Sequence, residues 1–293
     1  MAQTRISIAK PDIVRFFEKD GRKIYTQRDL GEIVAKQRNF WRLAMSMRVS
    51  EFILYLVAYA KLRKVSFKLP HRTETRFVWG DISHYKLAVS MKPNGYLSHY
   101  SALYLHHLTE QVPKTIYVNH EQRPHAPSAE GLVQERIDAA FKRPQRMTKN
   151  FTEYEGIRFC YVNGMHTGRL GVVELVDSLG DVVPVTGIER TLIDCTVRPM
   201  YAGGVSEVVG AYKRARNKIS LNKLSVTIKK MNYMYPYERV IGFYLEKSGF
   251  PSKNIRRHRL FQPPKDGLDF YLVHGMKEKD YVNEWRLYIP KGF

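Results

Sequence analysis

Apolar side chains recur at helical spacing between residues 49 and 60. Successive members are three or one positions apart, which places all of them on one face of a helix: Val49, Phe52, Ile53, Leu56, Val57 and Ala60. The opposite face would carry Arg48, Glu51, Tyr55 and Tyr59. The pattern therefore predicts an amphipathic helix that buries one side.

Another helix is predicted shortly before this one. Thr26 can cap its first turn, and Asp29 stands three residues later in a capping-box arrangement. The next apolar positions keep helical spacing: Leu30, Ile33 and Val34. The polar stretch 36–39 then separates the two helices.

Alternation replaces helical spacing after residue 64. Residues 65–69 alternate as a strand, 70–75 have the composition of a turn, and 76–79 form the returning strand. A supporting helix is expected to open at Pro11 and to end at Gly21. Helix, turn, helix and hairpin together predict a winged helix-turn-helix domain over residues 1–80.

Residues 81–293 predict a second domain of mixed composition, so the predicted fold class is α+β. Helices are expected at 98–107, 132–141, after Gly187, and at 205–216, 220–230 and 237–248. Strands are expected at 114–119, 157–162, 172–176, 182–185, 255–261, 268–273 and 282–289. Residues 120–150 lack periodicity and are interpreted as a long excursion.

Positive charge is concentrated at the amino-terminal end. The chain carries a net charge of +20, and residues 1–80 alone hold 17 lysines and arginines against 7 acids, a net charge of +10. A basic domain of this kind attracts polyanions, and its coincidence with a DNA-binding pattern favours nucleic acid as a partner.

Other classes are disfavoured by composition. The longest apolar run, residues 52–60, is too short for a membrane span, and residues 1–5 lack the apolar core of a secretion signal. We therefore expect a cytoplasmic protein that contacts no membrane. The two cysteines, Cys160 and Cys195, are isolated in apolar surroundings and are expected to be buried thiols.

A winged helix contacts DNA through three groups of residues. The first helix start can bind phosphate, the second helix start can reach base edges, and the hairpin can follow the backbone or minor groove. The corresponding candidates are Thr26, Gln27 and Arg28; Arg42, Ser46, Arg48 and Ser50; and Lys64, Lys68, His71, Arg72 and Arg76. Arg48 could read guanine or contact only phosphate, and winged helices also serve as protein-interaction modules.

Catalytic patterns are weak. Asp269 and Glu284 fall on predicted late strands, as nuclease carboxylates can, but no lysine follows two residues after the second acid. His106 and His107 lack further ligands at metal spacing, and Gly203-Gly204 lacks the rest of a phosphate-binding loop. No enzyme activity, metal or cofactor is expected. Arg190 and Asp194, one helical turn apart, predict a structural ion pair.

Four stretches resemble the AbiEi family, the antitoxins of a phage-abortive, type IV toxin–antitoxin system. They are Tyr96–Leu103, Leu108–Val118, Glu189–Asp194 and Arg198–Gly204, in that order along the chain. The resemblance implies that the winged helix binds inverted repeats in the operon's own promoter and represses it. It further implies that the C-terminal domain counteracts a nucleotidyltransferase-like toxin without requiring a stable complex.

Three hypotheses follow. The first is a non-enzymatic antitoxin and autorepressor that binds double-stranded DNA. The second is a nuclease that the winged helix directs to nucleic acid, motivated by Asp269 and Glu284. The third is a protein-interaction adaptor of a phage-defence complex.

Overall fold

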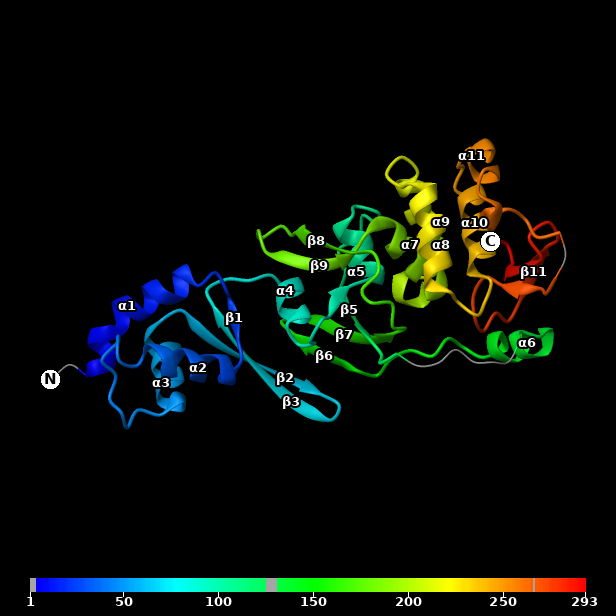
Figure 1. Cartoon of the computed structure of the whole chain (residues 1–293). Coiled ribbons are helices and arrows are strands. Elements are labelled where there is room, and N and C mark those ends of the chain that lie inside the picture. Colours follow the sequence, from blue (N-terminus) through cyan, green and yellow to red (C-terminus); the bar gives the residue numbers. More distant parts are fainter. Residues whose placement is uncertain (1–3, 125–130, 266) are drawn as a thin grey trace.

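The computed structural model describes residues 4–124, 131–265 and 267–293. The protein is α+β, with helices packed against three β-sheets in its described part. Figure 1 shows an elongated arrangement, with the N-terminal helices at one end, a six-stranded sheet in the middle, and a helical layer with the C-terminal strands at the other end. None of the described helices is long and apolar enough to cross a membrane.

The first eighty residues form three helices and a small antiparallel sheet. In chain order the elements are α1 (Arg5–Lys19), β1 (Ile24–Tyr25), α2 (Gln27–Gln37), α3 (Val49–Tyr59), β2 (Leu62–Leu69) and β3 (Arg72–Trp79). β3 is central and pairs with β1 on one side and with β2 on the other. Both predicted helices, the capping box at Thr26 and Asp29, and the hairpin are present.

The prediction for the first helix was wrong at its start. α1 begins at Arg5, with Thr4 as its cap, and Pro11 lies inside it. Proline has a helix-compatible φ, but inside a helix it loses its hydrogen bond to the residue four positions earlier and its ring crowds the carbonyl of that residue. Ile6 and Ala9 are buried on the preceding turns, and their packing holds the helix together across the proline.

The β2–β3 hairpin has two faces with different neighbours. Ser66 lies opposite Thr75 on a face that is exposed towards the hairpin tip. On the other face Val65, Phe67 and Val78 are buried in a core shared with the six-stranded sheet. The predicted boundary at residue 80 therefore crosses a continuous apolar core, and the hairpin belongs to the packing of both parts.

The middle of the molecule is a mixed sheet with the strand order β6-β7-β5-β4-β9-β8. Its elements are α4 (His84–Val89), β4 (Tyr96–Leu97), α5 (His99–Leu105), β5 (Thr115–Glu121), β6 (Phe151–Tyr154), β7 (Ile157–Gly164), β8 (Val172–Val176) and β9 (Val182–Thr186). β5 runs parallel to β7, so that His120 lies opposite Asn163 and both strands end at the same edge of the sheet.

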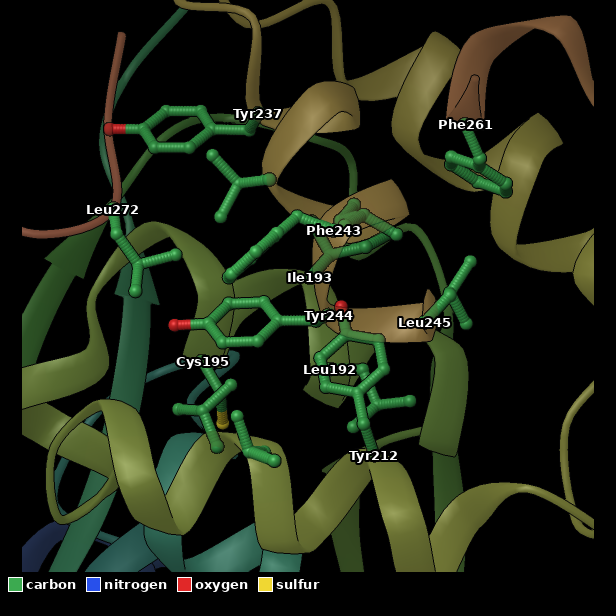
Figure 2. Packing of buried hydrophobic residues seen from close by; sticks show 14 of the residues in the cluster. Leu192, Ile193, Cys195, Tyr212, Tyr237, Phe243, Tyr244, Leu245, Phe261 and Leu272 are labelled. Carbon is green, nitrogen blue, oxygen red and sulfur yellow. The ribbon is translucent and has the colours of Figure 1, made fainter. Parts of the chain in front are cut away.

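A helical layer packs beside this sheet. It contains α7 (Ile188–Val197), the 3-10 turn η1 (Pro199–Ala202), α8 (Val205–Ala215), α9 (Leu221–Met231) and α10 (Tyr237–Lys247). Figure 2 shows α7 and α10 side chains meeting Tyr212 of α8 in one core. The rings of Tyr212 and Tyr244 stack with centroids 5.3 Å apart. Cys195 is buried here and Cys160 is buried in β7, so the prediction of two free buried thiols is confirmed.

The C-terminal region differs most from the prediction. It contains α11 (Ser252–Arg256), the 3-10 turn η2 (Arg259–Phe261), β10 (Phe270–Tyr271), β11 (Lys279–Val282) and β12 (Leu287–Pro290). The predicted strand at 255–261 is thus helical, and the one predicted at 268–273 shortens to β10. The strand predicted at 282–289 spans the end of β11, the turn after it and most of β12. The excursion at 120–150 contains α6 (Gln134–Lys142) and an extended segment, while residues 125–130 lie outside the described part.

Candidate nucleic-acid interface

The start of α2 is closed by its own capping box. The Thr26 hydroxyl accepts a hydrogen bond from the Asp29 amide at 3.2 Å, and the Thr26 amide donates to the Asp29 carboxylate at 2.7 Å. Burial acts to raise the pKa of Asp29, but the hydrogen bonds from Thr26 lower it below its usual value. Thr26 therefore supports the helix end, while Gln27 and Arg28 are exposed beside it.

Arg28 forms an exposed ion pair with Glu32, at 3.0 Å. Such a surface pair contributes at most about 1 kcal/mol, because water screens both charges. The guanidinium can therefore exchange Glu32 for a phosphate at little cost.

The connection between α2 and α3 is fixed by Arg38. Its guanidinium donates to the carbonyl oxygens of Ala44, at 2.5 Å, and Met47, at 3.1 Å. Arg42, at a positive φ of 50°, is exposed on this connection. The side chains of Arg42 and Arg48 form no hydrogen bond or ion pair with the described residues, so both cations are available at the entry to α3.

The outward face of α3 is less polar than predicted. Ser46 and Ser50 are exposed, but Leu54 is 68% exposed and Tyr59 is 63% exposed on the following turns. Val57, expected on the buried face, is 39% exposed. The cationic character of this region is therefore confined to the helix entry, and the next turns could offer apolar contact of the kind that thymine methyl groups take.

The hairpin divides the predicted cations into two groups. Lys64 and Lys68 lie on the outward face of β2 and have no ion-pair partner in the described structure. Arg72 near the tip is exposed but pairs with Glu74. Lys64 and Lys68 extend the positive surface from the helices towards the tip, whereas Arg72, opposite Leu69, lies on the other face of the hairpin.

Arg76 does not belong to this surface. Its guanidinium pairs with Glu74 at 2.9 Å and donates to the carbonyl oxygen of Ser90, just after α4, at 3.0 and 3.2 Å. Its side chain is only 13% exposed. The structure thus places Arg76, predicted as a DNA contact, between the hairpin and the middle of the molecule, apart from the exposed cations.

A basic recess at the hairpin tip was missed by the sequence analysis. His71 and Arg72 line a cavity of about 370 Å³ together with Lys92 and Lys149. Burial lowers the pKa of Lys92, and the charge of Arg72 lowers it further. The residues that line this recess come from three separate segments of the chain. In the sequence, only the basic character of residues 142–149 could have indicated it.

The two carboxylates proposed for a nuclease site lie in different surroundings. Asp269 lies before β10, where it pairs with Arg286 at 2.7 Å and accepts from the Tyr281 hydroxyl at 2.7 Å. Glu284 is exposed in the turn between β11 and β12. In the described residues no three His, Cys, Asp or Glu side chains are grouped to hold a metal ion. Neither acid lies on a strand, where the sequence placed both.

The second domain contains a buried polar network around α7. Arg190 pairs with Asp194 at 2.8 Å, as predicted, and its guanidinium also donates to the Leu170 carbonyl oxygen at 2.8 Å. Burial is the largest single influence and would lower the pKa of Arg190, but the charge and hydrogen bond of Asp194 together with the nearby Tyr96 raise it above its ordinary value. The neighbouring Thr167 hydroxyl contacts Arg190 at 3.2 Å and donates to Glu121 at 2.5 Å.

Glu121, the last residue of β5, accepts further hydrogen bonds. It accepts from the hydroxyl of Tyr96, at 3.0 Å, and from the amides of Thr167 and Arg169, each at 3.0 Å. The motifs around Tyr96 and Arg190, separate in sequence, therefore meet in a single network.

No protein-family model matches this chain, and no curated protein matches its sequence. A solved structure, that of the RV2827C protein from Mycobacterium tuberculosis, is similar in fold. The two share 15% sequence identity with a TM-score of 0.59, over 96% of this chain and 91% of that one. At this identity the likeness concerns the fold alone.

Proposed function

We propose that this chain is a cytoplasmic, DNA-binding antitoxin of the AbiEi type, which represses its own promoter through an N-terminal winged helix-turn-helix. The observation that carries the proposal is the arrangement of the first eighty residues. Their order α1-β1-α2-α3-β2-β3 and the sheet order β1-β3-β2 support a winged helix, in which the β2–β3 hairpin would be the wing.

The charges support duplex DNA as the ligand. Arg42 and Arg48 stand exposed at the entry to α3, the recognition helix of this proposal, and Lys64 and Lys68 stand on the outward face of the wing. Side chains at these places meet base edges and phosphates in winged helices. Because these cations lack acidic partners in the described structure, binding to phosphate breaks no existing ion pair.

The antitoxin part of the proposal rests on the resemblance and on one structural relationship. The segments that carry the resemblance pack together, since Tyr96 and Arg190 belong to the same buried network. The proposal assigns to this second domain the counteraction of a nucleotidyltransferase-like toxin, without a stable complex and without an enzymatic step of its own.

DNA binding is tested by titrating the full chain into a labelled fragment of its upstream region and into a scrambled fragment. We expect the upstream fragment to bind more tightly and Arg48→Ala to lose about 1–3 kcal/mol of that preference. Arg257→Ala, the same charge change at an exposed position after α11, is the matched control. Equal affinity for both fragments would reject specific repression.

Antitoxin activity is tested separately by expressing the neighbouring reading frame with and without this chain. We expect growth arrest in its absence and recovery in its presence, including with the Arg48→Ala variant. A neighbour that is harmless by itself would remove the antitoxin part and leave DNA binding standing.

A further inference from the structure

A second basic recess lies at the edge of the six-stranded sheet, about 630 Å³ in volume. We call it the strand-end cleft. Its main lining residues are Gln122, Arg146, Lys149, Asn163, Arg198 and Tyr201. Gln122 follows β5, and Asn163 lies near the end of β7, so the cleft sits at the carboxyl ends of two neighbouring parallel strands. This edge is where open sheets commonly hold small ligands, and the volume suits a ligand of nucleotide size.

The cleft is strongly positive. Arg146, Lys149 and Arg198 line it, and no acidic side chain does so in the described structure. Arg198 is half-buried, yet its guanidinium makes no hydrogen bond or ion pair with the described residues. It lies 5.9 Å from the centre of the Tyr201 ring. A partly desolvated guanidinium without a carboxylate is costly, and an anion in the cleft would remove that cost.

Behind the cleft lies a buried site in which the Arg190–Asp194 ion pair adjoins Arg198. His99 is buried close to Arg190 and Arg198; burial lowers its pKa to about 3, with both arginine charges acting in the same direction. The imidazole is therefore neutral at physiological pH. A smaller cavity, which shares Arg198 with the cleft, is lined by His99 and Asn119 and by both members of the Arg190–Asp194 pair.

The cations are held in place by a fixed frame. The Thr148 amide donates to the buried Tyr201 hydroxyl at 2.8 Å, and the Thr148 hydroxyl donates to the Tyr161 carbonyl oxygen at 3.2 Å. The Tyr161 amide in turn donates to the Asn150 carbonyl oxygen at 2.8 Å. Arg146 and Lys149 thus flank an anchored segment, which lowers the ordering cost of binding.

We propose that the strand-end cleft binds a nucleoside polyphosphate. Arg146, Lys149 and Arg198 take the phosphates, and the amide side chains of Gln122 and Asn163 offer the paired donors and acceptors that a base or sugar needs. Arg198 is recessed, so the end of a small ligand can reach it. A duplex is a poorer fit, because its phosphates contact cations that point outward from the surface. This proposal is independent of DNA binding by the N-terminal helices.

The test is equilibrium binding of ATP, GTP, CTP and UTP to the full chain by calorimetry, with pyrophosphate and phosphate as comparison ligands. We expect saturable one-to-one binding of at least one nucleotide, tighter than pyrophosphate. Arg198→Gln and the double variant Arg146→Ala/Lys149→Ala should each weaken it about tenfold or more. Arg257→Ala is the charge control, and thermal unfolding of each variant reports whether its fold is intact.

Four outcomes would overturn the proposal: no saturable binding of any nucleotide, pyrophosphate binding as tightly as the nucleotide, well-folded cleft variants that bind unchanged, or loss of nucleotide binding in Arg48→Ala. The last outcome would place the ligand at the N-terminal helices. Promoter binding measured on the same samples separates the two proposals, because the cleft variants should retain it.

Discussion

Phe67 of the β2–β3 hairpin packs against Phe159 of β7, with ring centroids 5.8 Å apart. Both rings are fully buried, and Phe67 also lies beside Tyr154 of β6 at 5.6 Å. The hairpin therefore inserts one face into the core of the second domain while its other face carries Lys64 and Lys68. A duplex held by the hairpin would be held in a fixed orientation relative to that domain.

The shared core predicts that the two parts unfold together. Phe67→Ala should lower the free energy of unfolding by about 3–5 kcal/mol, because it removes a buried ring and leaves a cavity. Chemical denaturation of a Trp285→Phe protein, whose fluorescence comes from Trp41 and Trp79, should give coincident transitions by circular dichroism and by tryptophan fluorescence. Val226→Ala, at a half-exposed position on α9, is the control and should change stability by less than about 0.5 kcal/mol. Separate transitions for the two signals would contradict a shared core.

Two cations of the hairpin should respond differently to substitution, since Lys68 is expected to bind DNA and Arg76 to stabilise the fold. Lys68→Ala should weaken promoter binding and reduce the slope of log affinity against log salt by about 0.9, the value for one phosphate contact, with the unfolding midpoint unchanged. Arg76→Ala should instead destabilise the fold, because it leaves Glu74 partly buried without this partner and frees the Ser90 carbonyl oxygen. The two variants are compared by DNA binding at several salt concentrations and by thermal unfolding. An Arg76→Ala protein that is as stable as the unsubstituted protein, with a reduced slope of log affinity against log salt, would make Arg76 a DNA contact instead of a structural residue.

The helices and the hairpin were predictable because their signals are local. Thr26 and Asp29 cap α2 through residues three positions apart, and the apolar spacing of α3 needs no distant partner. The two-residue strands β1 and β4 were missed, because they exist through pairing with β3 and β5 rather than through their own sequence. The segment 255–261 was misread since Ile255 and Phe261 are buried from two short helical turns rather than from a strand.

The surface chemistry was predictable only in part. Exposure of Arg48 and Lys68 follows from amphipathic spacing, which the sequence displays. The burial of Arg76 depends on Ser90, which approaches only once α4 has packed. The strand-end cleft brings Arg146 and Arg198 together across separate segments, and no pattern within either segment indicates the other.

The buried pair in α7 should behave as a coupled unit. Asp194→Leu leaves the Arg190 guanidinium buried without its carboxylate and should cost about 3–5 kcal/mol. Replacing both residues, Arg190→Met with Asp194→Leu, removes the uncompensated charge and should cost less than the single change. Denaturant unfolding of the single and double variants measures this coupling, and strictly additive losses would show that the pair contributes nothing as a pair.

His99 should make stability depend on pH. Burial, followed by the charges of Arg198 and Arg190, lowers its pKa in the folded state to about 3, against an ordinary value of 6.5. Between these two values the unfolded chain binds a proton that the folded chain does not bind. The neutral imidazole therefore makes its full contribution to the free energy of unfolding above about pH 6.5. It is lost as the pH falls from there towards 3, at about 1.4 kcal/mol per pH unit.

The matched substitutions are His99→Asn and His107→Asn. Both histidines have a positive φ, 51° and 55°, which asparagine tolerates, but His107 is exposed. Unfolding free energies at pH 7 and pH 5 should fall more steeply in the unsubstituted protein than in His99→Asn, whereas His107→Asn should keep the original dependence. Because the two changes are alike in backbone and chemistry, His107→Asn controls for the substitution itself. An unchanged pH dependence in His99→Asn would mean that the buried imidazole accepts a proton in the folded state.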